Sequence, residues 1–324
     1  MSQITAASDL EYWMQRLRDK ERCTFPILDD GVENASIQAQ WVDVKVLDSS
    51  LLDAFCRDNE LKLSTVFQTA WALVVRSYTD RDDVCFGYCE DSQLIPRHLV
   101  IPRESGLRHV LDSVDTSYTR DSNHRSCNLA DIEASLNLDE GGLFNTELWF
   151  RQRDGDYGLE SASVGGSRLN SRSVIGVEVE SGPGCSVSLR LRYRHAGLSD
   201  GQALNVSSSM EMALLCVLQE THRSVGEQSL FSEHHQRQVK QWDRHPPEEQ
   251  NLSLHGAMLL LGRVIAKSKA ELSGSLSKKQ KETAVKANLA IQQYITKKGK
   301  AAKELLALKK LSLVLEPKIS LSPL

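Results

Sequence analysis

The stretch STVFQTAWALVVRSYTDRDDVCFGY, residues 64–88, decides the fold of this chain. Ser64 is a good N-cap for a helix. Residues on one face of that helix recur at three- and four-residue spacing and are apolar or small: Val66, Phe67, Ala70, Leu73, Val74 and Ser77. Polar residues 79–83 then predict a turn, and the apolar run 84–88 has strand character. A buried helix that leads into a buried strand is the unit of an α/β sheet.

The N-terminal part of the chain continues this alternation of helix and strand. Asp9 is predicted to cap a helix that runs through Lys20. Residues 42–46 alternate apolar and polar side chains, as a strand does. A short helix is predicted to begin at Ser49 or Ser50. Its inward side chains are expected to be Leu51, Leu52, Ala54 and Phe55.

Further elements follow in the second half of the first 255 residues. Asn128 opens a predicted helix over residues 129–134, and residues 143–151 predict a strand. Alternating apolar residues between 177 and 193 flank a Gly/Pro loop, which is typical of a β-hairpin. Ser199-Asp200 is predicted to cap a long helix that runs to Leu218. Together these patterns predict a mixed α/β fold.

Composition narrows the class of protein. With 324 residues, of which 40% are hydrophobic, the chain can hold one large domain or two smaller ones. The N-terminus lacks the basic patch and apolar core of a secretory signal, so a cytoplasmic location is expected. The seven cysteines are an odd number without a Cys-x-x-Cys pair, which favours reduced thiols. Cys85 and Cys89 are close together, but no second ligand pair follows at metal-binding spacing, and no metal site is predicted.

The charge of the chain changes near residue 255. The net charge is -4, yet from Arg263 onward 14 basic residues face 4 acidic ones, and 13 of the 14 are lysines. Residues 256–324 are therefore predicted to be a separate lysine-rich tail. Its basic, amphipathic pattern could contact nucleic acid or an anionic membrane, or it could be an appendage without a ligand. The single aromatic residue, Tyr294, offers little for stacking on bases, so no nucleic acid is expected as a partner.

Several motifs, taken in order, resemble the second half of a fungal nonribosomal peptide synthetase condensation domain. They are residues 64–88, Tyr12-Trp13 with Phe25-Pro26, residues 127–132, residues 143–146, residues 198–203, and a linker-like segment that includes residues 230–233, Trp242-Asp243 and Pro246-Pro247. The resemblance implies the fold of chloramphenicol acetyltransferase, in which two α/β lobes enclose a tunnel, with this chain supplying the C-terminal lobe. It predicts a partial condensation-like domain over 1–225, a linker to an adenylation domain over 226–255, and the tail over 256–324.

The catalytic motif of that family, His-His-x-x-x-Asp-Gly, does not occur in the chain. His234-His235 is followed by no Asp-Gly, and we interpret it as a solvated helix start. His195 precedes Asp200-Gly201 by five residues where the motif needs four. Asp200 is better explained as a helix cap that accepts the free N–H groups of the first turn. We therefore assign no catalytic, cofactor-binding or metal-binding residue.

A second departure concerns the tunnel itself. After Tyr88 the family continues through a segment that lines the tunnel floor, whereas here residues 90–97 pass quickly to residues 100–102. Residues 171–174 likewise replace an acidic-aromatic stretch expected in the family. Trp149 is expected in the core or at a contact between lobes.

The sequence contains no other recognisable catalytic pattern. Neither Gly165-Gly166 nor Gly182-Pro183-Gly184 has the context of a phosphate loop, and no Gly-x-Ser-x-Gly elbow occurs. No carrier-type serine motif is present, so the phosphopantetheine arm of the family is expected on partner proteins. Asp154 and Asp156 lie beside Tyr157 in a turn that is expected to be a solvated loop.

Three functions from different classes remain open. The first is a truncated synthetase-like protein of fungal secondary-metabolite biosynthesis, a condensation-domain remnant that does not form amide bonds alone. The second is a binding or scaffold module that docks on a partner synthetase or carrier protein. The third is an acyltransferase completed by another chain that supplies the histidine motif. The missing histidine argues against the third, because removing a general base costs about 100- to 10,000-fold in rate.

A lobe without its partner is also expected to expose apolar surface and to self-associate. Phe67, Trp71 and Leu73 are nevertheless predicted to be buried.

Overall fold

The computed structural model describes residues 2–27, 39–46, 49–90, 93–138, 141–152, 172–182, 186–195 and 197–244. The chain divides into two compact units, Met1–Leu230 and Phe231–Leu324. Several predictions fall outside the described residues: the lysine-rich tail, the end of the linker with Pro246-Pro247, the turn at Asp154 and Asp156, and Gly165-Gly166.

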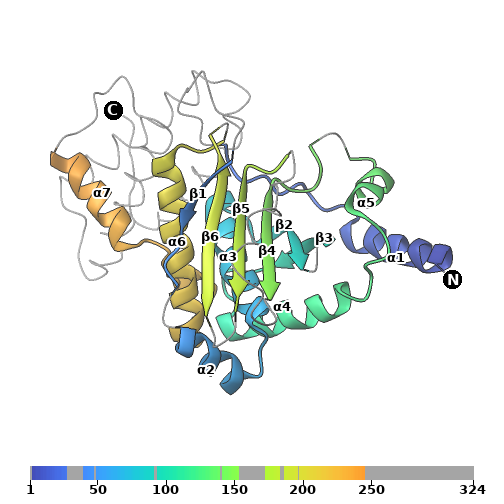
Figure 1. Ribbon diagram of the computed structural model, residues 1–324, viewed down its shortest axis with the longest axis horizontal. Helices are drawn as coiled ribbons and strands as arrows, with labels where there is room; N and C mark the ends of the chain where they lie inside the picture. The colour runs from blue at the N-terminus through green and yellow to red at the C-terminus, as the bar shows by residue number, and fades with distance from the viewer. Residues whose placement is uncertain are drawn as a thin grey trace, which may run out of the picture. The chain divides into compact units, whose positions relative to one another are not determined.

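Six strands of the first unit form one mixed sheet in the order β1-β6-β5-β4-β2-β3 (Figure 1). The strands are β1 (Ala39–Asp43), β2 (Asp83–Glu90), β3 (Gln93–Val100), β4 (Thr146–Gln152), β5 (Ile175–Ser181) and β6 (Val187–Arg194). The central pairs β2/β4 and β4/β5 are parallel, whereas β1/β6, β5/β6 and β2/β3 are antiparallel. The strand β3 is therefore one edge of this sheet and β1 the other.

Helices accompany the sheet, which confirms the predicted mixed α/β class. In the first unit they are α1 (Ser2–Leu17), α2 (Ser49–Asn59), α3 (Leu63–Thr79), α4 (Leu107–Asp121), α5 (Leu129–Ser135) and α6 (Asp200–Gln219), with a short 3-10 turn at Val225–Glu227. Figure 1 shows α3 behind the strands β4, β5 and β6. The second unit contains α7 (Glu233–Arg244).

Helix α3 and strand β2 are the buried helix and strand that residues 64–88 predict. Every residue from Ser64 to Val75 is buried, including Phe67, Trp71 and Leu73 as predicted. The Phe67 ring lies on the sheet, 6.4 Å from the ring centre of Phe150 in β4. Ser64 is not the N-cap, because Lys62 already has the extended backbone of a cap residue and the helix begins at Leu63.

The predicted start of the first helix is also wrong. Helix α1 begins at Ser2, so Asp9 lies in its middle and is buried. Its carboxylate accepts a hydrogen bond from the backbone N–H of Ser126 (2.8 Å) and lies 2.9 Å from Nδ1 of His124. Burial opposes ionisation, but these contacts lower the pKa of Asp9 below its ordinary value. Asp9 therefore binds residues 124–126, which are distant in the sequence, and does not cap the helix.

Two predicted helix starts and the hairpin are confirmed. The Asn128 side chain accepts from the N–H of Asp131 at the start of α5. Ser199 and Gln202 form a capping box at the start of α6, in which each side chain bonds to the backbone of the other residue. Strands β5 and β6 pair as the predicted hairpin, with Ser181 opposite Val187.

Strand β3 and helix α4 were missed by the sequence interpretation. The register pairs Glu90 with Gln93, so two residues separate β2 from β3. Helix α4 buries residues at helical spacing, a pattern that the sequence contains and that could have predicted it: Leu107, Val110, Leu111, Val114 and Tyr118.

The two neighbouring leucines of α2 differ in burial, which corrects the prediction that both face inward. Leu52 is 1% exposed and Leu51 is 53% exposed. Successive residues of a helix point about 100° apart, so two neighbours cannot share one narrow buried stripe.

This difference gives a matched pair of variants. We expect Leu52→Ala to lower the free energy of unfolding by about 2 to 5 kcal/mol, because it leaves a cavity. Leu51→Ala should change it by less than about 0.5 kcal/mol. Urea denaturation followed by circular dichroism measures both, and equal losses would show that α2 does not pack as described.

Candidate functional site

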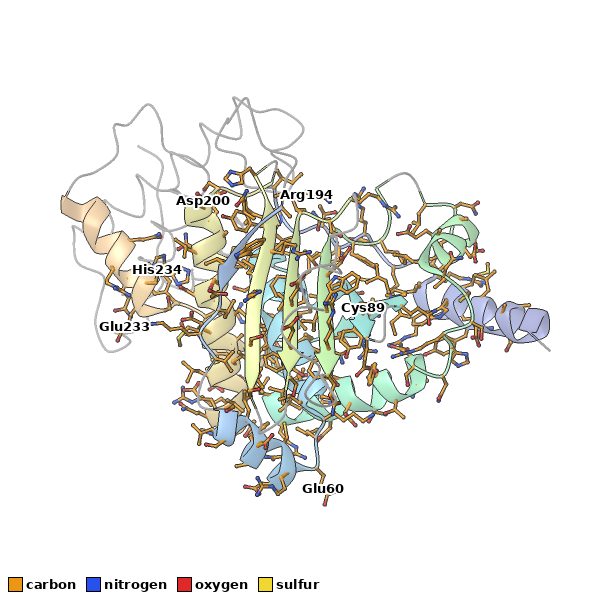
Figure 2. All side chains as sticks on the ribbon, in the orientation of Figure 1. Glu60, Cys89, Arg194, Asp200, Glu233 and His234 are labelled. Atoms are coloured by element: carbon orange, nitrogen blue, oxygen red, sulfur yellow. The ribbon has the colours of Figure 1, made fainter. Side chains whose placement is uncertain are left out.

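His195 is held at the start of helix α6. Its Nε2 lies 3.2 Å from Oδ1 of Asp200, and the Tyr193 hydroxyl donates to the same oxygen at 2.5 Å. Figure 2 shows Asp200 at the end of the sheet where β6 finishes at Arg194. Burial and the nearby Asp200 raise the pKa of Tyr193, so its hydroxyl stays a donor. The Asp200 carboxylate thus contacts both Tyr193 and His195, next to the helix cap at Ser199.

The His234-His235 pair lies at the start of α7 in the second unit. Nδ1 of His235 accepts from the backbone N–H of Ser232 at 3.0 Å and lies 2.8 Å from the Ser232 hydroxyl. His235 is buried, so the prediction of a solvated pair is wrong for this residue. Nε2 of His234 lies 3.1 Å from the side-chain nitrogen of Gln238, one helical turn further on. Both histidines therefore make their polar contacts with residues at the start of α7 or just before it.

Cys85 and Cys89 both lie in β2 and are buried. Burial raises the pKa of Cys85 well above its ordinary value, which suppresses the thiolate needed for nucleophilic attack or metal binding. Within the described part of the chain, no group of three or more His, Cys, Asp or Glu side chains could hold a metal ion.

The sheet face opposite α3 carries charged and aromatic side chains, which we call the ladder face. The register places Trp149, Glu178, Arg190 and Asp43 across four neighbouring strands. Ion pairs connect the strands, with Arg192 to Glu178 at 3.0 Å and Arg190 to Asp43 at 3.3 Å. Trp41 lies opposite Arg192 and is 65% exposed. This face is therefore polar, with an exposed tryptophan at the β1 edge.

Trp149 is fixed on the ladder face by its own strand. Its Nε1 donates to Oε2 of Glu147 at 2.9 Å, and the side chain is only half-buried. Glu147 is fully buried and also accepts a hydrogen bond from the Ser173 hydroxyl. The predicted place of Trp149 in the core is thus met only in part, and its contact with another lobe stays a prediction.

The apolar surface expected of a lobe without its partner does not dominate the ladder face. The exposed large hydrophobic residues of the described chain are spread over different elements: Ile27, Trp41, Leu51, Val100 and Leu204. Self-association stays a prediction, and an extensive apolar patch on this face is not its basis.

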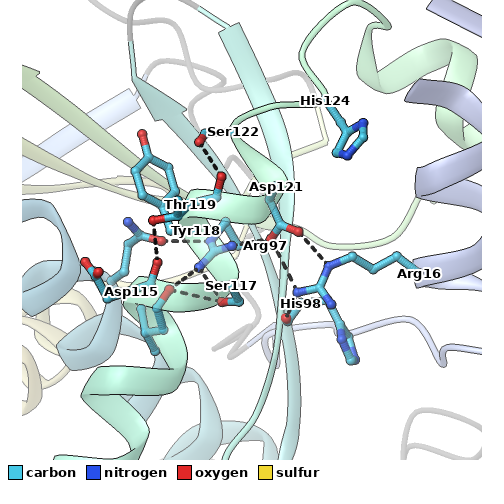
Figure 3. Close-up of polar contacts among 12 residues, drawn as sticks. Arg16, Arg97, His98, Asp115, Ser117, Tyr118, Thr119, Asp121, Ser122 and His124 are labelled. Atoms are coloured by element: carbon cyan, nitrogen blue, oxygen red, sulfur yellow. Dashed lines mark hydrogen bonds and ion pairs between the residues drawn. The ribbon is translucent and has the colours of Figure 1, made fainter. Parts of the chain in front are cut away.

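A buried polar cluster at the β3 edge was not predicted from the sequence (Figure 3). Arg97 of β3 is fully buried, and its guanidinium pairs with the equally buried carboxylate of Asp121 at the end of α4. Arg97 also donates to the side chain of Gln68 in α3 (2.8 Å) and to the backbone oxygen of Val114 (3.1 Å). One arginine thereby connects a strand to two helices.

Helix α1 joins the same carboxylate. Nε of Arg16 lies 2.7 Å from Oδ1 of Asp121, and the Tyr12 hydroxyl donates to it at 2.5 Å. Burial and the charge of Asp121 raise the pKa of Tyr12, so the phenol stays protonated. Asp121 therefore has two arginine partners, Arg97, which is buried, and Arg16, which is half-buried. No spacing in the sequence links Arg16, Arg97 and Asp121, because they come from three separate elements.

Comparisons with known proteins agree with this architecture. The chain matches no protein-family model. It is 28% identical to nonribosomal peptide synthetase 4 of Gibberella zeae over 273 residues, which is 76% of this chain and 4% of that protein. It is 26% identical to nonribosomal peptide synthetase 1 of Aspergillus fumigatus over 274 residues, or 77% of this chain and 4% of that protein. The chain thus spans a small fraction of the curated relatives it matches.

Solved structures give the same class of fold. The condensation domain of the monacolin K polyketide synthase MokA matches with a TM-score of 0.56 at 11% identity, over 68% of this chain and 59% of that one. The first condensation domain of the calcium-dependent antibiotic synthetase matches with a TM-score of 0.52 at 12% identity, over 69% of this chain and 54% of that one. The first unit therefore has the fold of part of a condensation domain. Its sequence is similar to fungal nonribosomal peptide synthetases, as the motifs indicated.

No described helix has the combination of length and apolar character that crossing a membrane requires.

The Arg97–Asp121 pair provides a test of the described core. We expect Asp121→Asn to lower the free energy of unfolding by about 3 to 5 kcal/mol, because it leaves a buried arginine without its counter-charge. Asp112→Asn on the same helix removes an exposed carboxylate that pairs with Arg108, and should cost less than about 1 kcal/mol. Denaturant midpoints of the two variants measure the contrast. Similar midpoints would contradict the buried pair.

Proposed function

We propose that this chain is a condensation-type module of fungal secondary-metabolite peptide biosynthesis and that it does not form amide bonds by itself. One observation carries the proposal: the sequence combines this fold with no His-His-x-x-x-Asp-Gly motif. Its nearest substitutes, His195 and His234-His235, are engaged at helix starts. The family reaction would join aminoacyl groups carried on the phosphopantetheine arms of partner proteins.

Proton transfer is the step that the missing His-His-x-x-x-Asp-Gly motif would assist in the family reaction. An amine that attacks a thioester must lose a proton, and a positioned base accelerates such a transfer by about 100- to 10,000-fold. His195 precedes Asp200-Gly201 by five residues instead of four, and His234-His235 is followed by no Asp-Gly, so neither has the spacing of the family's catalytic histidine. The two-residue connection between β2 and β3 leaves little chain for a tunnel floor at that point.

A second candidate function is docking on a partner through the ladder face. Trp41 is 65% exposed beside paired charges, and exposed tryptophan with arginine is typical of the energetic centre of a protein interface. The partner would be another condensation lobe, a synthetase or a carrier protein. If that partner supplied the histidine motif, the same contact would complete an acyltransferase.

The activity proposal has a direct assay. We expect the full chain, mixed with donor and acceptor carrier proteins loaded with aminoacyl groups, to give no condensed product above background. Intact-protein mass spectrometry of the carriers measures the result, with a condensation domain that contains the histidine motif as the positive control. His195→Ala should leave the background unchanged. Condensation that disappears in His195→Ala would overturn the proposal and show that His195 is catalytic.

The docking candidate is tested with a separate N-terminal condensation lobe that carries the histidine motif. We expect the full chain to bind this lobe and Trp41→Ala to weaken binding about tenfold or more, because a buried interface tryptophan commonly contributes over 1.4 kcal/mol. Leu204→Ala, which changes an exposed apolar residue of α6, is the matched control. Isothermal titration calorimetry measures both. Binding that is unaffected by Trp41→Ala would exclude the ladder face as the contact.

A further inference from the structure

A groove of about 750 Å³ lies at the β3 edge of the first unit. Helices α1 and α4 supply its walls, and the end of β3 supplies His98, Leu99 and Val100. Its size falls within the range of small-molecule sites. None of the activities considered above uses this groove.

The groove carries an excess of basic side chains. Arg16, Lys20 and Arg120 line it together with the imidazole of His109. The His98 imidazole also lines it, but this ring contacts the Asp83 carboxylate, and burial lowers its pKa, which favours the neutral form. The one acidic residue in its lining is Asp112, whose carboxylate lies 3.2 Å from Nε of Arg108. The lining is therefore suited to an anion rather than to a cation or an apolar ligand.

Two of the three guanidinium nitrogens of Arg16 have partners in the structure. Its Nε pairs with Asp121 at 2.7 Å, and its Nη2 donates to the backbone oxygen of His98 at 3.2 Å. Nη1 makes no hydrogen bond or ion pair with any residue that the structure describes. Because Asp121 also neutralises the buried Arg97, one carboxylate serves two arginines and a positive charge remains. Figure 3 shows Arg16 reaching from α1 toward Asp121 beside His98.

The other basic groups are less engaged. Lys20 Nζ lies 3.8 Å from the nearest carboxylate oxygen of Asp83, at the outer limit of an ion pair. The exposed side chains of Arg120 and His109 form no hydrogen bond or ion pair within the described ranges. These groups can bind a ligand without breaking contacts that hold the fold.

We propose that this groove binds a small ligand that carries phosphate. Its α4 wall runs from His109 to Arg120, about 16 Å at 1.5 Å per residue, with the hydroxyls of Ser113 and Thr116 between them. A single carboxylate is satisfied by one arginine, whereas a phosphate ester carries a charge of about -1.5 to -2 and three strong acceptor oxygens. Several hydrogen-bond donors spread along a groove therefore match a phosphate ester better than a carboxylate. This inference does not depend on the condensation-related function.

The probes are pyrophosphate and inorganic phosphate, titrated into the full chain by calorimetry at low salt. We expect saturable binding of pyrophosphate and weaker binding of phosphate, with amide NMR shifts at Ser113 and Thr116. Arg120→Gln should weaken pyrophosphate binding about tenfold, the loss expected for one charge-assisted contact. Adding His109→Gln should weaken it further. Neither variant removes a described contact of the fold.

Arg57→Gln is the matched control, since it removes the same charge from an exposed position on α2 outside the groove. It should bind pyrophosphate like the unaltered chain, and it accounts for any general attraction of the lysine-rich tail. Malonate tests whether a dicarboxylate serves equally well, and it should bind at least tenfold more weakly. Absence of pyrophosphate binding, an equal loss in Arg57→Gln and Arg120→Gln, or equal binding of malonate would each overturn the proposal.

Discussion

The burial of helix α3 is the constraint on which the rest of the lobe depends. Twelve consecutive residues of this helix, from Ser64 to Val75, are buried. A helix that is buried all round must be covered on every side, so the sheet and the helices α4 and α6 pack around it. The strand β2 follows directly and lies next to the edge strand of the sheet. Residues 64–88 thereby determine where both the ladder face and the β3 edge can lie.

The Arg97–Asp121 pair shows how the edge of this core is completed. Burying two charges is costly, and the cost is offset only when each charge keeps good partners. Arg97 meets this condition through Gln68, Val114 and Asp121. The same carboxylate orients the half-buried Arg16, so the interaction that connects α1 and α4 to the sheet also positions a donor in the groove. A change at Asp121 should therefore affect both the stability of the fold and the proposed anion binding. A change at Arg120 should affect binding alone.

The two surfaces of this lobe have different chemistry. The ladder face is a nearly neutral array of paired charges with an exposed tryptophan, which suits a protein partner with complementary side chains. The groove has unpaired positive charge and suits a small anion. Both surfaces belong to a lobe that has the condensation-domain fold but whose sequence lacks the histidine motif. Similarity to a family of enzymes does not by itself indicate catalysis, because function lies in the site and not in the fold.

Local sequence patterns determined the helix–strand unit at residues 64–88, the hairpin of β5 and β6, the cap at Ser199 and the similarity to condensation domains. Each of these depends on neighbours a few residues apart, which a sequence displays directly. Tertiary structure decided four further features. They are the contact of Asp9 with Ser126, the burial of His235, the burial of Leu52 but not of Leu51, and the pairing of Arg97 with Asp121. Asp9 and Ser126 are 117 residues apart, and Arg97 and Asp121 are 24 residues apart on β3 and at the end of α4. A polar side chain is satisfied by whichever partner the fold brings within hydrogen-bond distance, and no local pattern specifies that partner.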